Sequence, residues 1–116
     1  MKSISQFINV VFPIPANRVF CYSVPESLRA QVGIGTRVLA PFGNRDSVGF
    51  VTDKIDKTEI QNIKEIKKIL DVQPLISPSL FKLARWMSDY YACSLGESLD
   101  TILPHRYRPS RVKKKS

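Results

Sequence analysis

The 116-residue sequence is poor in the residues from which metal centres and common catalytic sites are built. It has two cysteines, Cys21 and Cys93, and a single histidine, His105. With no CxxC pair and one histidine, we expect no zinc site. The same scarcity argues against a Ser-His-Asp triad and leaves Cys21 without a nearby histidine base. One disulfide could join the two cysteines, but we expect reduced thiols, as is usual in a cytosolic protein.

Nucleotide-binding loops and membrane segments are also missing. The sequence has no GxxxxGK[ST] loop, so we expect no nucleotide-hydrolysis site. Gly33 and Gly35 lack the third glycine of a dinucleotide-binding turn and do not open a helix. No apolar run approaches the roughly 20 residues that cross a bilayer, and polar side chains interrupt residues 1–7 where a signal peptide would begin. We therefore expect a cytoplasmic binding module that is noncatalytic by itself, needs no cofactor in this chain and has no membrane partner.

Acidic residues are fewer than basic ones, and the difference is concentrated at one end. The chain has 18 Lys and Arg against 10 Asp and Glu, a net charge of +8. Residues 105–116 contain six of these basic residues and no acidic one, which leaves residues 1–104 nearly balanced. A basic tail can bind phosphates nonspecifically, but it can equally be a solvated linker or the cut end of a longer chain. We expect one domain over residues 1–104, followed by a basic tail or the start of an interdomain linker over residues 105–116.

The first half of the chain has the pattern of strands separated by turns. Runs rich in β-branched and aromatic residues are bounded by proline and glycine, and they predict five extended segments: 7–12, 18–24, 36–40, 47–54 and 63–70. The turn cluster at 41–46 predicts a hairpin between the third and fourth segments. Residues 25–29 fit one short helical turn. Gly49 inside the fourth segment suggests a bulge or a close backbone approach.

The second half has helical signals. Ser77 followed by Pro78 is typical of a helix start, because serine caps the first turn and proline fits the first helical position. Four residues then fall on one face, with Trp86 and Tyr90 on an adjacent stripe: Leu80, Ala84, Met87 and Tyr91.

A second, shorter helix follows. Ser94 and Glu97 have the spacing of a capping box and should open this helix, which Pro104 would end. Its inward-facing residues would be Leu95, Leu99 and Ile102. The predicted fold is mainly β with C-terminal helices, namely a small antiparallel β barrel or sandwich capped by two helices.

Three features of the first half suggest a ligand site. In a strand, Phe20 and Tyr22 share one face and Cys21 lies on the other, so the two rings form either core or the wall of a pocket for a flat ligand. In the turn that follows the third strand, Gly43 would let a ligand approach the backbone. Lys64 is a lone cation in an apolar setting.

This combination suits a single terminal nucleotide. A ring would stack on the base, backbone groups would read its edge and the lysine would meet a phosphate. Core packing for the rings, an ordinary hairpin turn at Gly43 and a solvated Lys64 are the alternatives that the sequence leaves open.

Resemblance to a known family supports the pocket interpretation. A set of short motifs occurs in one order across nearly all of residues 7–104: FPIP at 12–15, RVFCYSVP at 18–25, GTRVLAPFG at 35–43, VGFV at 48–51, IKKILDVQPL at 66–75, WMSDYY at 86–91, LG at 95–96 and LP at 103–104. In this ordered set the chain resembles the N-terminal domain of the PriA (primosomal protein N′) family of replication-restart helicases.

The resemblance implies a DNA-binding function. A domain of this family captures the 3′-terminal nucleotide of the nascent leading strand at a stalled fork, whatever its base, and so supports replication restart. The matching positions are Phe20, Cys21, Tyr22, Gly43 and Lys64. We name Arg18, Arg45, Arg106, Arg108 and Arg111 as further candidates for phosphate contacts.

The rest of such a helicase is absent from this chain, including the ATPase lobes and the zinc-binding cysteines. The resemblance therefore implies that ATP, magnesium and zinc belong to the missing helicase part, and that the primosome and single-strand-binding proteins would be partners of the full-length protein. Residues 105–116 fit the start of the family's basic linker.

The residue between the two rings departs from the family pattern. The family usually reads Phe-Asp-Tyr where this chain has Phe20-Cys21-Tyr22. A thiol is a poor hydrogen-bond acceptor and is uncharged at neutral pH. We expect a weaker preference for a free 3′-hydroxyl than in a Phe-Asp-Tyr relative, by about 1.5–3 kcal/mol. Two other functions stay open: nonspecific binding of single-stranded DNA through the tail and aromatics, and a protein-interaction domain with a decayed pocket.

Overall fold

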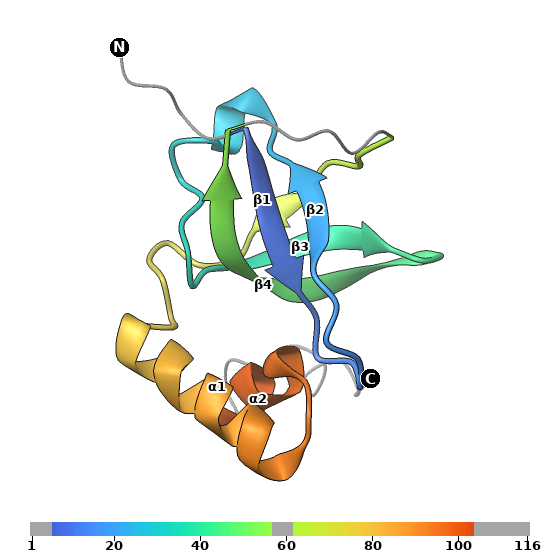
Figure 1. Ribbon diagram of the computed structural model, residues 1–116. Coiled ribbons are helices and arrows are strands. Elements are labelled where there is room, and N and C mark those ends of the chain that lie inside the picture. The colour runs from blue at the N-terminus through green and yellow to red at the C-terminus, as the bar shows by residue number, and fades with distance from the viewer. Residues whose placement is uncertain (1–5, 57–61, 104–116) are drawn as a thin grey trace, which may run out of the picture.

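The protein has a five-stranded antiparallel sheet followed by two helices (Figure 1). The computed structural model describes residues 6–56 and 62–103. The elements are β1 (Phe7–Val11), β2 (Phe20–Ser23), the 3-10 turn η1 (Glu26–Leu28), β3 (Arg37–Phe42), β4 (Arg45–Ile55), β5 (Lys68–Ile69), α1 (Pro78–Tyr91) and α2 (Leu95–Ile102). The predicted class, mainly β with two C-terminal helices, is confirmed.

The long strand β4 holds the sheet together. The strand order is β2-β1-β4-β3-β5, so β4 pairs with β3 through its first half and with β1 through its second half. The predicted hairpin is confirmed, with Phe42 opposite Arg45 at its end. Phe50 pairs with both neighbouring strands, and soon after it the register of β4 against β1 shifts between Asn9 and Val10. A side chain at Gly49 would collide with those of Val10 and Phe12, so the predicted close approach is present there.

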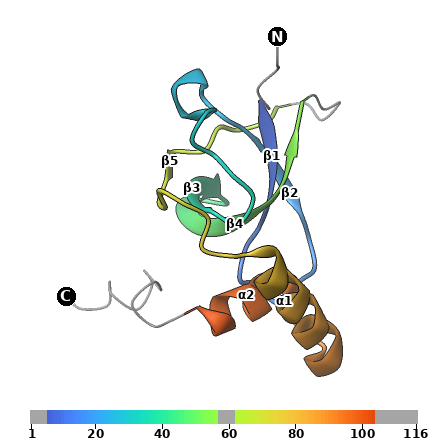
Figure 2. The ribbon, with the colours of Figure 1, turned by 90° about the vertical axis from the view of Figure 1, so that its left-hand side faces the viewer.

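The segment predicted as one strand over 63–70 forms hydrogen bonds with two different strands, β2 and β3. Its first part joins β2, because the Ser23 N–H donates to the Lys64 carbonyl at 2.9 Å and Ser23 accepts from the Ile66 N–H at 3.1 Å. Its second part joins β3, where only Lys68–Ile69 forms a strand. The segment thus contacts both β2 and β3 without a continuous ladder of hydrogen bonds, so the sheet is not a closed barrel (Figure 2).

Both helices lie below the sheet and begin as the sequence predicts (Figure 1). The Ser77 hydroxyl accepts from the Leu80 N–H at the start of α1, and the capping box of Ser94 and Glu97 is present at the start of α2. The core cluster of the sheet is formed mainly by strand residues and comprises Ile8, Val10, Phe12, Tyr22, Val24, Val32, Val38, Ala40, Val51 and Ile66. A second core cluster fills the space between helices and sheet, and comprises Val11, Phe50, Ile76, Phe81, Ala84, Leu99 and Leu103. Leu99 is fully buried and faces this cluster as predicted, with Leu95 and Ile102 packed against it.

The prediction for α1 is only partly right. Its buried residues are Phe81, Ala84 and Ser88. Ala84 was predicted to face inward, but Phe81 and Ser88 each follow by one position a residue of the predicted face. Tyr91 was expected to face inward, but it is 63% exposed. The helix ends at Ala92, whose left-handed conformation turns the chain toward α2. Pro104, the expected end of the second helix, lies outside the described residues. Among the described helices none is long and apolar enough to span a membrane.

Candidate nucleic-acid interface

The two rings of β2 share one face, as the alternation predicts. Phe20 and Tyr22 both contact the ring of Phe12, edge to face, with centroids 5.7 and 6.2 Å apart. Their burial differs, because Tyr22 is a member of the core cluster of the sheet and only 5% exposed, whereas Phe20 is half-buried at the margin of that cluster. Tyr22 is thus a core residue at the base of this region, and Phe20 is the ring that a ligand can reach.

The hydroxyl of Tyr22 ties β2 to the hairpin between β3 and β4. It donates to the Pro41 carbonyl oxygen at 2.6 Å, two residues before Gly43. Burial raises the pKa of the Tyr22 phenol above its ordinary value of 10.0. The bond fixes the position of the hairpin relative to β2, although the residues it joins are 19 positions apart.

Gly43 exposes its backbone at the tip of this hairpin. Its φ of +67° is a conformation that glycine adopts without the strain other residues incur. A Cβ placed on Gly43 would meet nothing within 4 Å, so the space around it is open. A ligand can therefore approach the turn closely, as the sequence suggests.

Phe42 and Arg18 complete the surroundings of Phe20. Phe42 stacks on Phe12, with centroids 4.4 Å apart, and meets Phe20 edge to face at 5.2 Å. The Arg18 guanidinium lies 5.1 Å from the centre of the Phe20 ring. A base that stacks on this side of the ring has to displace the guanidinium, which is then available for a phosphate.

Lys64 and Arg45 are cations on the two segments that adjoin β2 and Phe42. The hydrogen bond from Ser23 to the Lys64 carbonyl places Lys64 beside β2, with its side chain exposed. Arg45 is exposed opposite Phe42 at the hairpin. A further exposed contact, Lys67 to Asp46 at 4.0 Å, connects the segment after Lys64 to the hairpin.

The structure thus brings three distant segments to one end of the sheet, around residues 18–22, 41–45 and 64. We call Phe20, Cys21, Tyr22, Gly43 and Lys64 the candidate site. Cys21 is half-buried on the opposite face of β2 from the rings, opposite Asn9 of β1. Arg106, Arg108 and Arg111 lie outside the described residues. The sequence analysis assigned no role at the site to Phe12 or Phe42. Their ring contacts join residues far apart in the sequence, so local patterns do not reveal them.

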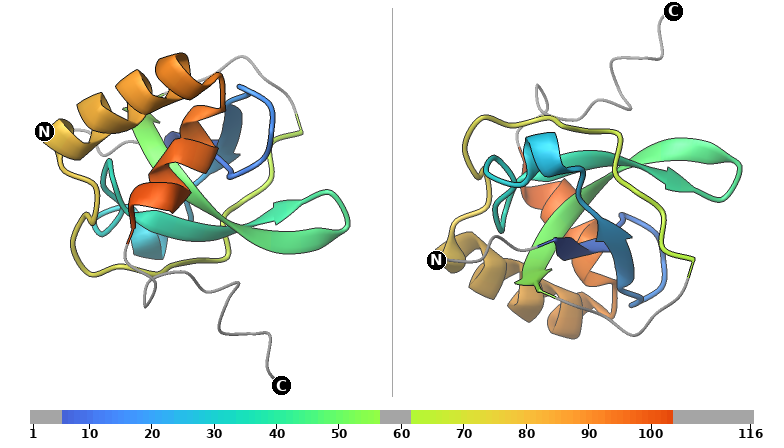
Figure 3. Two further views of the ribbon diagram at one scale, coloured as in Figure 1. Left: turned by 90° about the horizontal axis from the view of Figure 1, so that it is seen from below. Right: turned by 90° about the horizontal axis from the view of Figure 1, so that it is seen from above.

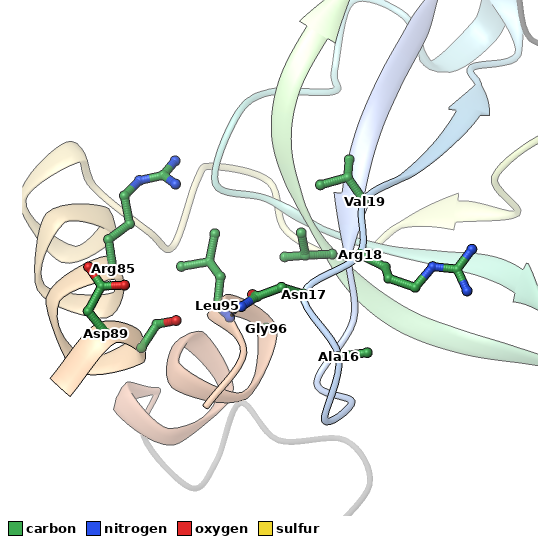
Figure 4. A pocket seen from close by; sticks show the side chains of 10 residues that line it. Ala16, Asn17, Arg18, Val19, Arg85, Asp89, Leu95 and Gly96 are labelled. Carbon is green, nitrogen blue, oxygen red and sulfur yellow. Dashed lines mark hydrogen bonds between the residues drawn. The ribbon is translucent and has the colours of Figure 1, made fainter. Parts of the chain in front are cut away.

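Two cavities of about 370 Å³ each lie elsewhere, between the loop that joins β1 to β2 and the two helices, and Figure 4 shows the one that Arg18 and Arg85 help to line. They share Ala16, Asn17, Ser88 and Asp89. The sequence gave no signal for them, since their walls come from segments some 70 residues apart. Arg85 and Asp89 project from α1 toward this space, whereas Arg18 points away from the helices (Figure 4). The charged residues are Arg18, Arg85 and Asp89 in the first cavity and only Asp89 and Glu97 in the second, so neither lining favours a polyanion.

The chain matches one family of known proteins along most of its length. Residues 9–104 match the PriA family described as the 3′DNA-binding domain (3′BD). The chain is 32% identical over 108 residues to the replication restart protein PriA of Treponema pallidum, with 88% of the chain covered, and 33% identical over 105 residues to that of Haemophilus influenzae, with 89% covered. It spans only 16% and 14% of these two relatives. The chain belongs to the family of 3′ DNA-binding domains of the replication restart protein PriA.

Proposed function

We propose that this domain captures the 3′-terminal nucleotide of a DNA strand whatever its base, and that at a stalled fork this strand is the nascent leading strand. The observation that carries the proposal is the gathering of the candidate site at one end of the sheet. The Tyr22–Pro41 hydrogen bond positions the turn of Gly43, and the Ser23–Lys64 hydrogen bond positions the lysine. Membership of a family described as 3′DNA-binding supports the same function.

Each part of the site has a separate chemical role in this proposal. Phe20, supported from behind by Phe12 and Phe42, offers a ring on which a base stacks. Every base has a flat π face, so stacking selects none of the four. The open backbone at Gly43 accommodates the sugar, and Lys64 supplies a positive charge for the phosphate. Base-independent binding follows because none of these contacts requires one particular base edge.

End recognition needs a contact that a continuing strand cannot make. A terminal nucleotide carries a free 3′-hydroxyl, whereas an internal nucleotide carries a phosphate that must leave the site. Cys21 stands where the family usually has aspartate, and its thiol is a weaker acceptor for that hydroxyl. We therefore propose that Cys21 contributes only weakly to the discrimination between a terminal and an internal nucleotide.

A binding series with linear and circular oligothymidine of equal length tests this function, each at low and high salt. We expect tighter binding of the linear strand, with a ratio that persists at high salt, because stacking on Phe20 releases no counterions and only the Lys64 contact depends on salt. Changing only the 3′-terminal base should alter the affinity little. Equal affinity for circle and linear strand, with a steep salt dependence, would instead indicate nonspecific binding through the basic tail.

Two substitutions connect the result to the candidate site. Phe20→Ala should reduce the affinity for the linear strand about 5- to 150-fold, the effect of losing one stacking contact of 1–3 kcal/mol. Lys64→Ala should weaken it by less and reduce its salt dependence by about one unit of slope. Ile34→Ala, which shortens a 46% exposed apolar side chain in a different loop, is the matched control and should bind as the unmodified protein does.

The activity of a longer parent protein is part of the same proposal. Because this chain spans 14–16% of the two relatives, ATP-dependent unwinding would reside in the remainder, together with any magnesium and zinc. Contacts with primosome and single-strand-binding proteins would also form through the longer protein. The domain itself would supply DNA binding and no catalysis.

A further inference from the structure

We propose that the outer face of α1 is a second DNA contact, a stacking platform for single-stranded DNA that does not require a 3′ end. We call this surface the α1 aromatic face and define it as Leu83, Trp86, Tyr90 and Tyr91. These side chains are 43%, 55%, 67% and 63% exposed. They are four of the seven large apolar side chains that stand exposed on the described part of the chain, and no other element carries two of them. A cluster of this kind on one helix marks a binding surface.

The three aromatic rings on this face contact one another. Trp86 and Tyr90 are four residues apart, so they lie one above the other on the helix, and their rings stack in parallel at 4.9 Å with an interplanar angle of 12°. Tyr91 meets Tyr90 edge to face at 4.9 Å. The stack therefore presents flat aromatic surface that is already ordered. Nucleobases bind such surfaces by extending the stack, at about 1–3 kcal/mol per base.

The charge next to the stacked rings favours a polyanion as the ligand of the α1 aromatic face. Lys82 lies one turn before Trp86 on the same stripe and is exposed, whereas Arg85 projects toward the cavities beside the β1–β2 loop (Figure 4). Asp89 is the one carboxylate on α1. The chain carries +8, but six of its basic residues lie in residues 105–116, so the positive charge beside the stacked rings comes from Lys82. Four side chains are also far fewer than the 20–30 residues that each partner contributes to a standard protein interface.

The α1 aromatic face is separate from the candidate site. The helix lies at the periphery of the molecule, on the far side of α2 from the β3–β4 hairpin that carries Gly43 (Figure 3). None of its four residues belongs to the proposed 3′-end site, so DNA without an end can bind here while the other site is empty. The inference goes beyond the proposed function and does not depend on it.

The position of Trp86 allows a direct test, because it is the single tryptophan of the chain. The protein is titrated with circular oligothymidine, which has no 3′ end, and tryptophan emission is followed. We expect quenching that saturates with binding, since thymine would stack on the Trp86 indole. Tyr90→Ala should weaken this binding about 5- to 150-fold, which is the loss of one stacking contact. Trp86→Phe, measured by anisotropy of labelled DNA, should retain most of the affinity.

Val72→Ala is the matched control, because Val72 is 97% exposed on a loop outside α1, and it should bind the circle unchanged. Binding without quenching, or equal affinity for Tyr90→Ala and the unmodified protein, would overturn the proposal. So would a dimer in sedimentation experiments that Trp86→Ala dissolves, because the face would then be a protein contact. End capture is scored separately, as the linear-to-circular affinity ratio, so either proposal can fail while the other holds.

Discussion

Replacing Tyr22 with phenylalanine should loosen the connection between β2 and the hairpin without disturbing the core. Phenylalanine keeps the ring against Phe12 but loses the hydroxyl that donates to the Pro41 carbonyl at 2.6 Å. A hydrogen bond contributes about 0.5–1.5 kcal/mol net, and an orphaned buried carbonyl costs about 1–3 kcal/mol. Pro41 is half-buried, so water can take up part of the lost contact. We expect the free energy of unfolding to fall by about 1 kcal/mol, or about 4–8 °C in Tm for a domain near 100 residues.

The same substitution should change how stability depends on pH. Burial raises the pKa of the Tyr22 phenol above 10.0, so the folded protein holds this proton more tightly than the unfolded chain does. The stabilisation is complete below pH 10 and is lost as the pH rises through the folded-state pKa, because the unfolded chain ionises first. The variant lacks this group. The difference in stability between the two proteins should therefore narrow above about pH 10.

Urea unfolding at neutral and alkaline pH measures both effects. Tyr90→Phe is the control, since Tyr90 is 67% exposed, and it should change stability by less than about 0.5 kcal/mol. The Tyr22 variant should also bind 3′-ended DNA several-fold more weakly, because the turn of Gly43 is less firmly held. A Tyr22→Phe protein as stable as the unmodified one at neutral pH, or a stability difference that does not change with pH, would refute the reasoning.

Three further substitutions test other parts of the account. Cys21→Asp should increase the preference for a 3′-hydroxyl over a 3′-phosphate about ten- to a hundredfold, measured by competition binding, and an unchanged preference would contradict the role given to this position. Asp71→Asn removes the carboxylate that pairs with the buried Arg37 at 2.8 Å, and it should lower the free energy of unfolding in urea by about 3 kcal/mol. Asp46→Asn breaks the exposed pair with Lys67 and should lower it by under about 1 kcal/mol. Gly96→Ala should destabilise by about 1–3 kcal/mol despite alanine's better helix propensity, because its Cβ would collide with the β1–β2 loop backbone. Gly33→Ala, with its nearest neighbour at 3.8 Å, should be close to neutral, and equal effects at the two glycines would argue against this packing.

Features that depend on neighbouring residues could be predicted from the sequence. The cap at Ser77 and the box of Ser94 and Glu97 are bonds within three residues, at 3.0 to 3.2 Å, so local spacing determines them. The hairpin after β3 is local as well. Its turn needs a residue that tolerates positive φ, and Gly43 marks the position.

Features that depend on distant partners could not be predicted. The segment over 63–70 has the composition of one strand, but its hydrogen-bond partners lie on two different strands, and composition does not reveal which edge each half will meet. The periodicity of α1 places Tyr91 on an inward stripe, yet its side chain is exposed. Its exposure depends on where α2 packs, and the sequence of α1 alone does not determine that position.

The same distinction between local patterns and distant partners applies to the candidate site. Alternation placed Phe20 and Tyr22 on one face, and that is confirmed. It could not tell which ring is buried, because that is decided by Phe12 and by a hydrogen bond to Pro41 across 19 residues. The roles of the five site residues in binding DNA stay predictions.

The most direct test of the central claim compares two oligonucleotides that differ only at the 3′ end. One carries a 3′-hydroxyl and the other a 3′-phosphate, and the Kd of each is measured at low and high salt for the unmodified protein. The account predicts tighter binding of the hydroxyl end, with a ratio that survives high salt and holds for all four terminal bases. Equal Kd values for the two ends at both salt concentrations would contradict capture of the 3′ terminus.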